Sequence, residues 1–330
     1  MVRISAASAK SARRFVHGLA LIAATAVTAA TAPVHAQSWP TKQPIKLVAV
    51  FPPGGSVDQV ARILAQPLQA QLGQTVIVEN KGGASGSIGA AFVAQAPADG
   101  YTCAVVFDSH AVNPALIPSL PFDTKKDLAA VSLIGTAAMT IATPATSEYK
   151  SFADVATALK AGKPVSYGTI GNGSLGHLAM TLLGKQNGLN WQHVPYKGGG
   201  PMMQDAVGGH VPLVIGSVFV VKPHIDSGRV RALAVTTAKR SAELPNVPAL
   251  AEVGYGQFEA PAWWAVLAPA KTPPEIVARM NAEISKALQN PDTAKKLEAQ
   301  GISLIGGAPE TARVFIEKQI DIWGKVVKDY

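Results

Sequence analysis

Residues 45–58 read Ile-Lys-Leu-Val-Ala-Val-Phe-Pro-Pro-Gly-Gly-Ser-Val-Asp, and this stretch decides the fold class. The apolar run 45–51 is typical of a strand that is buried on both faces, and the proline–glycine run after it ends that strand. We expect Ser56 to open a helix as its N-cap, with Gln59 three residues later completing a capping box. A buried strand, a glycine turn and a helix together make the repeating unit of an α/β protein.

The same unit recurs along the chain, whose 330 residues suggest about two domains. Apolar runs that predict further strands lie at 76–78, 101–107, 165–170, 211–217 and 230–237. Stretches of helical periodicity separate them, and a final amphipathic helix is predicted from the spacing of Ile316, Ile320, Trp323 and Val327. The sequence therefore predicts an α/β fold.

The formal charge of +8 comes from 29 basic and 21 acidic residues. Four of the basic residues and none of the acidic ones lie in residues 1–36, which leaves 25 minus 21, or +4, for the rest. Those remaining basic residues are scattered along the chain. The basic stripe that marks a nucleic-acid-binding protein is therefore missing.

Residues 1–36 have the three parts of a secretory signal peptide. A basic segment ends at Arg13-Arg14, a weakly apolar stretch follows at 15–32, and Val34-His35-Ala36 forms a small-x-small cleavage site. We expect cleavage after Ala36 and export to the periplasm, rather than a retained membrane anchor. No later run approaches the ~20 apolar residues of a membrane span. Cys103 is the single cysteine, so we expect no intramolecular disulfide and a buried thiol.

Two loops between a strand and a helix are candidates for anion binding. Residues 54–56 and 171–174 are rich in glycine and serine, and each precedes a predicted helix. Free backbone N–H groups and the helix dipole favour an anion at such a place. One such loop alone is more simply a tight turn with a cap, and the presence of two leaves both interpretations open.

The usual catalytic and cofactor motifs are absent. Residues 171–176 match G-x-G-x-x-G, but the first acidic residue after them is Asp205, too far to hold a ribose. There is no G-x-S-x-G elbow, no Walker pattern and no histidine spacing suited to zinc. We therefore predict no catalytic residue, no cofactor and no metal.

A third loop begins at Asp108, directly after the apolar run 101–107. Open α/β sheets place their ligands at this end of their strands, so Asp108 could contact a cationic or hydrogen-bond-donating part of a ligand. The simpler alternative is that it caps a turn or the next helix.

The chain after residue 36 resembles, over essentially its full length, the Bug-type solute-binding proteins of tripartite tricarboxylate transporters. The segments that carry the resemblance are Phe-Pro-Pro-Gly-Gly-Ser-Val-Asp at 51–58, Val-Glu-Asn-Lys-Gly-Gly-Ala at 78–84, Asp-Gly-Tyr-Thr at 99–102, Asn-Pro-Ala-Leu at 113–116, Gly-Asn-Gly-Ser at 171–174, His-Val-Pro-Tyr-Lys-Gly-Gly-Gly-Pro at 193–201, Arg-Ala-Leu-Ala-Val-Thr at 231–236, Leu-Pro-Asn-Val-Pro at 244–248 and Leu-Ala-Pro-Ala-Lys-Thr-Pro-Pro at 267–274. Their number and order make the resemblance specific.

The resemblance implies a two-lobed, type II-like periplasmic binding protein fold, in which each lobe is a central sheet flanked by helices. Two crossover segments, expected near 136–143 and 257–264, would act as a hinge. They divide the chain into lobe one, 37–138 and 259–330, and lobe two, 139–258. The implied function is capture of a small carboxylate by hinge closure, for uptake by a tripartite transporter. A monomer and membrane subunits as partners are also implied.

The resemblance places the loops 54–56 and 171–174 on opposite sides of the cleft, where they would grip one carboxylate with ordered waters. The expected ligand-binding residues are Phe51, Gly54, Gly55, Ser56, Asp58, Ser85, Asp108, Ser109, His110, Asn113, Thr169, Gly171, Asn172, Gly173, Tyr196, Gly198 and Ser217.

Two places depart from the commonest family pattern, namely Asp108 and the run Ile215-Gly216-Ser217. A charged Asp108 would repel a second carboxylate, so we expect an amino acid, an N-heteroaromatic acid or a related amide in place of a tricarboxylate. Two other functions stay open from the sequence. One is a periplasmic, hydrolase-like α/β enzyme that uses the same cleft, and the other is a ligand-sensing partner of a membrane receptor.

Overall fold

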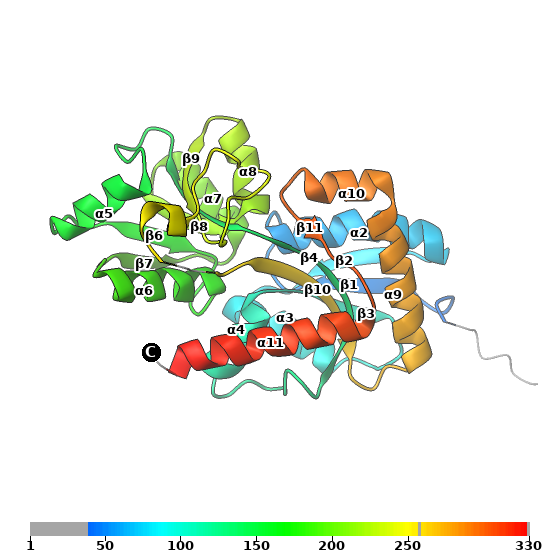
Figure 1. Cartoon of the computed structure of the whole chain (residues 1–330). Coiled ribbons are helices and arrows are strands. Elements are labelled where there is room, and N and C mark those ends of the chain that lie inside the picture. The colour runs from blue at the N-terminus through cyan, green and yellow to red at the C-terminus, as the bar shows by residue number, and fades with distance from the viewer. Residues whose placement is uncertain (1–38, 257–258, 329–330) are drawn as a thin grey trace, which may run out of the picture. The chain divides into compact units, whose positions relative to one another are not determined.

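The computed structural model of the chain describes residues 39–256 and 259–328 (Figure 1). Its strands form two mixed sheets, one in the order β11-β4-β10-β3-β1-β2 and one in the order β7-β6-β8-β5-β9. Helices flank both sheets (Figure 1), and the predicted two-lobed α/β fold is confirmed. The signal peptide expected at 1–36 lies outside the described residues.

The first sheet is built from both ends of the chain. Strand β1 pairs in parallel with β2 and β3, whereas β10 pairs antiparallel with β3 and β4. Its strands are β1 (Ile45–Ala49), β2 (Val76–Asn80), β3 (Thr102–Phe107), β4 (Leu128–Ala137), β10 (Ala262–Pro269) and β11 (Ser303–Leu304). The helices connected to them are α2 (Ser56–Leu72), α3 (Ser87–Ala94), α4 (Ser109–Leu116), α9 (Pro274–Gln289), α10 (Pro291–Glu298) and α11 (Pro309–Lys328).

The second sheet comes from the middle of the chain. Strands β6, β7 and β8 are parallel, and β5 runs antiparallel to both of its neighbours. Its strands are β5 (Met139–Pro144), β6 (Ser166–Thr169), β7 (Gln192–Pro195), β8 (Leu213–Ser217) and β9 (Val230–Val235). Its helices are α5 (Phe152–Lys160), α6 (Leu175–Asn187), α7 (Gly199–Gly208) and α8 (Val218–Asp226).

The chain passes between the two sheets at two places that lie together. Only one residue, Ala138, separates the end of β4 from the start of β5. The return path lies between β9 and β10, and Thr236 ties it to the first crossing. Its backbone N–H donates to the carbonyl oxygen of Met139 at 3.0 Å, and its hydroxyl donates to that of Ala260 at 3.0 Å. These paired crossings are where a rotation between the sheets would occur.

Aromatic side chains carry one apolar core from the first sheet to the second. Trp264 of β10 is fully buried, with its ring centroid 5.0 Å from that of Phe107 in β3. On its other side the centroid of Phe219 in α8 lies 5.8 Å away. Because α8 belongs to the second sheet, these contacts continue the core past the crossings. The buried thiol of Cys103 lies in the same core, as expected.

Two local predictions were wrong. The N-cap of α2 is Gly55 and not Ser56, because the carboxylate of Asp58 accepts the loop's N–H and no serine side chain caps the helix. Helix α8 was not predicted, because its β-branched valines resemble a continuation of the strand before it. Within the described residues no helix is long and apolar enough to cross a membrane.

Candidate functional site

Two adjoining hollows lie between the loops of the two sheets, and Phe51 and Ile170 line both of them. The outer hollow, of about 650 Å³, is lined by residues 51–53, 82–85, 170–172 and 195–197 together with Asn80. The inner hollow is only about 20 Å³ and is lined by Phe51, Gly55, Ser56, Val57, Phe107, Met139, Ile170, Gly199, Gly216, Ser217 and Val220. The inner volume suits about one water molecule. The two sheets are closed on one another in this arrangement, because the hydroxyl of Ser85 reaches the backbone of Asn172 across the cleft.

The starts of three helices converge on the inner hollow. Gly55 and Ser56 begin α2, Gly199 begins α7, and Ser217 is the N-cap of α8. Helix starts have backbone N–H groups without intrahelical partners, and these groups, together with the helix dipoles, favour a negatively charged group between them. At α8 the first N–H, that of Val218, already donates to the carbonyl oxygen of Ala138 at 2.8 Å, so α2 and α7 are the main donors. The lining thus combines apolar walls with a positive end, the character that a carboxylate group needs, and the hollow must widen beyond its present 20 Å³ to admit one.

The loop before α2 is held by Asp58, whose side chain is buried and turned away from both hollows. One carboxylate oxygen accepts the N–H of Gly54 at 3.0 Å, and the other accepts from Arg62 and Asn80 at 3.0 Å each. Burial acts to raise the pKa of Asp58, but these hydrogen bonds and the charge of Arg62 hold it below its ordinary value. Asp58 therefore shapes the loop, and its negative charge is balanced by Arg62 and by these hydrogen bonds.

The start of α7 lies opposite the loop at 54–56. A Cβ added to Gly55 would lie 3.7 Å from the backbone nitrogen of Gly199, and one added to Gly200 would lie 3.4 Å from the carbonyl oxygen of Pro53. Both distances are ordinary van der Waals contacts, so they measure how close the two segments lie. The two helix starts are thus near enough to share one small anion.

A hydrogen bond joins the sheets beside the outer hollow. The hydroxyl of Ser85 donates to the carbonyl oxygen of Asn172 at 2.5 Å. The carbonyl oxygen of Ser85 in turn accepts from the hydroxyl of Ser109 at 2.8 Å and from the amide of Asn113 at 3.1 Å. Ser85 has φ 50° and ψ 39°, the left-handed region that non-glycine residues rarely adopt. Helix α4 thus holds a strained residue in place to reach across the cleft.

Two buried polar groups make no hydrogen bond of good geometry within the described residues. They are the hydroxyl of Ser217, which lines the inner hollow, and the carboxyl of Asp108, which lines neither hollow and has only the backbone of Ser109 as a close polar neighbour. Burial raises the pKa of Asp108 well above its ordinary value. Burial thus disfavours the charged form of Asp108, which weakens the repulsion on which the expected exclusion of tricarboxylates depends.

The predicted site residues fall into three groups. Those that line a hollow are Phe51, Gly55, Ser56, Ser85, Gly171, Asn172, Tyr196 and Ser217. Those that shape a lining loop are Gly54, Asp58, Ser109, Asn113, Thr169, Gly173 and Gly198. The last two are Asp108, described above, and His110, which lines a separate small hollow beside α11.

Sequence reasoning missed several lining residues. Lys197 is the one basic residue of either lining and follows the predicted Tyr196 directly, so its position in the loop was a usable signal. Gly199 lies in the glycine run that the resemblance quoted. Met139 and Val220 gave no signal, because their place depends on the crossing and on the unpredicted helix α8.

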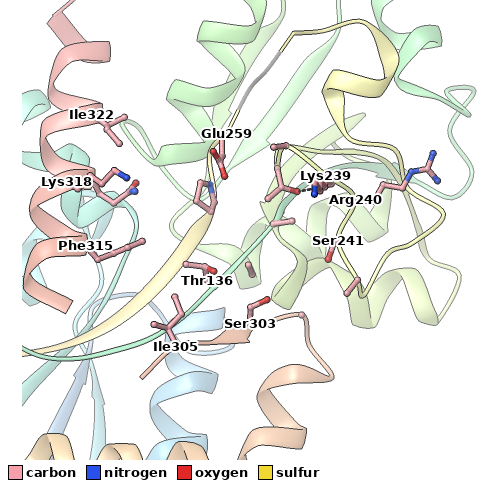
Figure 2. Close-up of a pocket in the computed structure, with 18 of the residues that line it drawn as sticks. Thr136, Lys239, Arg240, Ser241, Glu259, Ser303, Ile305, Phe315, Lys318 and Ile322 are labelled. Carbon is pink, nitrogen blue, oxygen red and sulfur yellow. Dashed lines mark hydrogen bonds between the residues drawn. The ribbon is translucent and has the colours of Figure 1, made fainter. Parts of the chain in front are cut away.

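A further hollow, of about 690 Å³, lies beside the crossings and shares no lining residue with the inner and outer hollows. Figure 2 shows Phe315 and Lys318 of α11 on one side of it, with Lys239 and Arg240 on the other. The walls come from both sheets, since residues 136–138 and 237–242 both contribute. We call this space the hinge hollow.

The comparison with known families matches residues 60–330 to the tripartite tricarboxylate transporter family receptor, TctC. The match covers most of the chain and includes elements of both sheets. The chain belongs to this family. Among related proteins, BugT of Bordetella pertussis is 38% identical over 302 residues, covering 90% of this chain and 92% of BugT. A protein from the tcbD-tcbE intergenic region of Pseudomonas sp. strain P51 is 36% identical over 323 residues, covering 96% and 94%.

Solved structures of TctC relatives have the same fold. The periplasmic binding protein BugD has a TM-score of 0.84 at 31% identity, covering 87% of this chain and 97% of BugD. An R. palustris protein solved with adipate has a TM-score of 0.84 at 35% identity, covering 88% and 97%. MatC from Rhodopseudomonas palustris, solved with malate, has a TM-score of 0.82 at 28% identity, covering 87% and 99%.

Proposed function

We propose that this TctC protein captures a small carboxylate between its two sheets and closes over it without chemical change. The observation that carries the proposal is the convergence of three helix starts, with the unpartnered Ser217 hydroxyl, on one enclosed apolar hollow. Two relatives of the same fold were solved with the dicarboxylates adipate and malate, which supports this ligand class. One carboxylate would bind in the inner hollow and the rest of the ligand would extend into the outer one.

The proposal includes the division of the chain and its place in the cell. Lobe one would comprise 37–138 and 259–330, lobe two 139–258, and closure would be a hinge rotation at the paired crossings. The ligand-binding residues would be those that line the two hollows, supported by the residues that shape their loops. The protein would be exported with cleavage after Ala36, act as a monomer, and deliver its ligand to tripartite transporter membrane subunits.

A thermal-shift screen of the purified protein tests this function. The panel holds mono-, di- and tricarboxylates, including adipate and malate, with amino acids, aromatic acids and their amides. A ligand at a thousandfold its dissociation constant stabilises the folded state by about 4 kcal/mol, which raises the melting temperature by several degrees. We expect a shift with at least one carboxylate, recovered unchanged. A shift with no member of the panel, or recovery of an altered compound, overturns the proposal.

A further inference from the structure

Two histidine rings are stacked behind the loop at 171–174. His177 comes from the first turn of α6 and His193 from strand β7, and neither lines a hollow. Their ring centroids are 3.9 Å apart, with 16° between the ring planes. The ring of Tyr167 in β6 also packs against His193, with the two centroids 5.3 Å apart. The pair is therefore fixed in position by three elements of the second sheet.

His177 supports the loop through its ring nitrogen. Its Nδ1 accepts a hydrogen bond from the backbone N–H of Gly173 at 3.1 Å. An imidazole can accept there only while Nδ1 carries no proton, so the ring must be neutral with its hydrogen on Nε2. The backbone N–H of His177 also donates to the side chain of Ser174, which caps α6. Both contacts orient the turn that follows the lining residues Gly171 and Asn172.

His193 supports the same loop through Thr169. The Nε2 atom of His193 lies 2.7 Å from the Thr169 hydroxyl oxygen. That hydroxyl donates its single hydrogen to the carbonyl oxygen of Gly171 at 3.0 Å and accepts the N–H of Gly171 at 3.2 Å. The assignment that satisfies all three contacts has His193 donating from Nε2. Thr169, buried beneath the loop, thus links the ring to both backbone groups of Gly171.

We propose that the stacked, neutral rings of His177 and His193 are positioning residues that hold Gly171 to Gly173 in the shape that binds the carboxylate. This inference rests on the proposed function, because it assigns the loop's shape to ligand capture. A proton on Nδ1 of His177 would face the Gly173 N–H with a second donor and break that contact. A proton on His193 would leave its contact with Thr169 intact but would place a charge against the neighbouring ring.

The surroundings of the pair keep it neutral. Burial lowers the pKa of both rings, and the neighbouring His177 lowers that of His193 further, to about 4. No carboxylate of the described residues shifts either pKa, and Tyr167 is the titratable side chain that packs on His193 from β6. Since both folded-state values lie below that of a free histidine, the pair contributes stability above about pH 6.5 that is lost as the pH falls.

The test compares two substitutions at each ring. In His177→Asn the side-chain oxygen stands near the position of Nδ1 and accepts a hydrogen bond without titrating, whereas His177→Phe keeps a flat ring and has no acceptor. In His193→Gln the amide nitrogen replaces the Nε2 donor, and His193→Phe removes it. His210→Asn, at an exposed histidine beyond α7, is the matched control.

Two readouts are measured on the purified protein. The first is amide hydrogen exchange at Gly171 and Gly173 without ligand. The second is the dissociation constant for adipate and malate at pH 7 and pH 4.5. We expect His177→Phe to speed exchange at Gly173 and to raise the dissociation constant, each by about five-fold, which corresponds to one net hydrogen bond. His177→Asn should stay within about two-fold at pH 7 and should lose less affinity than the wild type as the pH is lowered, because its side chain does not titrate. Titration of the ligand affects both proteins equally.

Unchanged exchange and affinity in both phenylalanine variants would overturn the inference. So would equal losses in His177→Phe and His177→Asn, because the ring would then act by packing and not as a hydrogen-bond acceptor. The exchange measurement needs no ligand, so it decides the inference even if neither dicarboxylate binds. Absence of binding to the whole carboxylate panel counts against the proposed function instead.

Discussion

The hydrogen bond from Ser85 to Asn172 joins the two sheets when the cleft is closed, and its contribution to ligand binding can be measured. We predict that Ser85→Ala weakens carboxylate binding by about five-fold, mainly through faster dissociation, because a typical net hydrogen bond contributes about 1 kcal/mol. The bond spans the cleft at 2.5 Å, so it exists only when the sheets are closed. Asn172 is exposed, and its carbonyl oxygen can bind water once the hydroxyl is gone. No buried group is left unsatisfied, which keeps the loss near this value.

Alanine is the right replacement because it isolates the hydroxyl. Ser85 has positive φ, and alanine meets the same backbone strain, whereas glycine would also relieve that strain and offset the loss. The matched control is Ser227→Ala, whose hydroxyl donates to the carbonyl oxygen of Pro223 at 2.9 Å on the exposed end of α8. Stopped-flow and calorimetric titration with the best carboxylate of the panel give the dissociation rate and constant. Equal dissociation rates and dissociation constants for the wild type and Ser85→Ala would show that this hydrogen bond does not stabilise the closed, ligand-bound state.

Three further predictions concern charge and the hinge. Lys197→Gln should raise the dissociation constant for a dicarboxylate, measured by calorimetry, about two- to three-fold at low salt. Because Lys197 is exposed, this effect should disappear at about 0.5 M salt, where its charge is screened. An effect that does not depend on salt contradicts a charge interaction. Burial raises the pKa of Asp108, so the wild type should lose stability relative to Asp108→Asn as the pH rises above about 4. The loss should be about 1.4 kcal/mol per pH unit until the raised pKa is reached. Melting temperatures of the two proteins that change in parallel from about pH 4 to 8 contradict this. Ala242→Trp should fill part of the 690 Å³ hinge hollow and favour the closed arrangement. We then expect ligand binding to tighten by up to about ten-fold. Weaker binding would show that this hollow narrows when the sheets close.

The strand–loop–helix units were predictable because their signals are local. The buried strand before Pro52 and the glycine loops at 54–56 and 171–174 all occur in the structure where the sequence placed them. The partner expected opposite 54–56 was the loop 171–174, which in the structure contacts Ser85. The start of α7 lies against 54–56, and which helix starts meet depends on how the sheets close, not on local sequence.

Other site features could not be predicted because they join residues that lie far apart in the chain. Ser85 and Asn172 are 87 positions apart, and their contact depends on a strained backbone at Ser85. His177 and His193 do not have a metal-binding spacing, so no sequence pattern indicated that they pair. Their stacking follows from the parallel pairing of β6 with β7, which brings His193 beside the start of α6.

The function proposed for this protein depends most on where and how a carboxylate binds. A crystal structure of the protein with the carboxylate that gives the largest thermal shift would test this directly. We predict one carboxylate group in the inner hollow, within hydrogen-bond distance of backbone N–H groups at the starts of α2 and α7. The two sheets should be closed around a chemically unchanged ligand. A ligand seated in the hinge hollow, or one bound to a single sheet with the cleft open, would contradict the account.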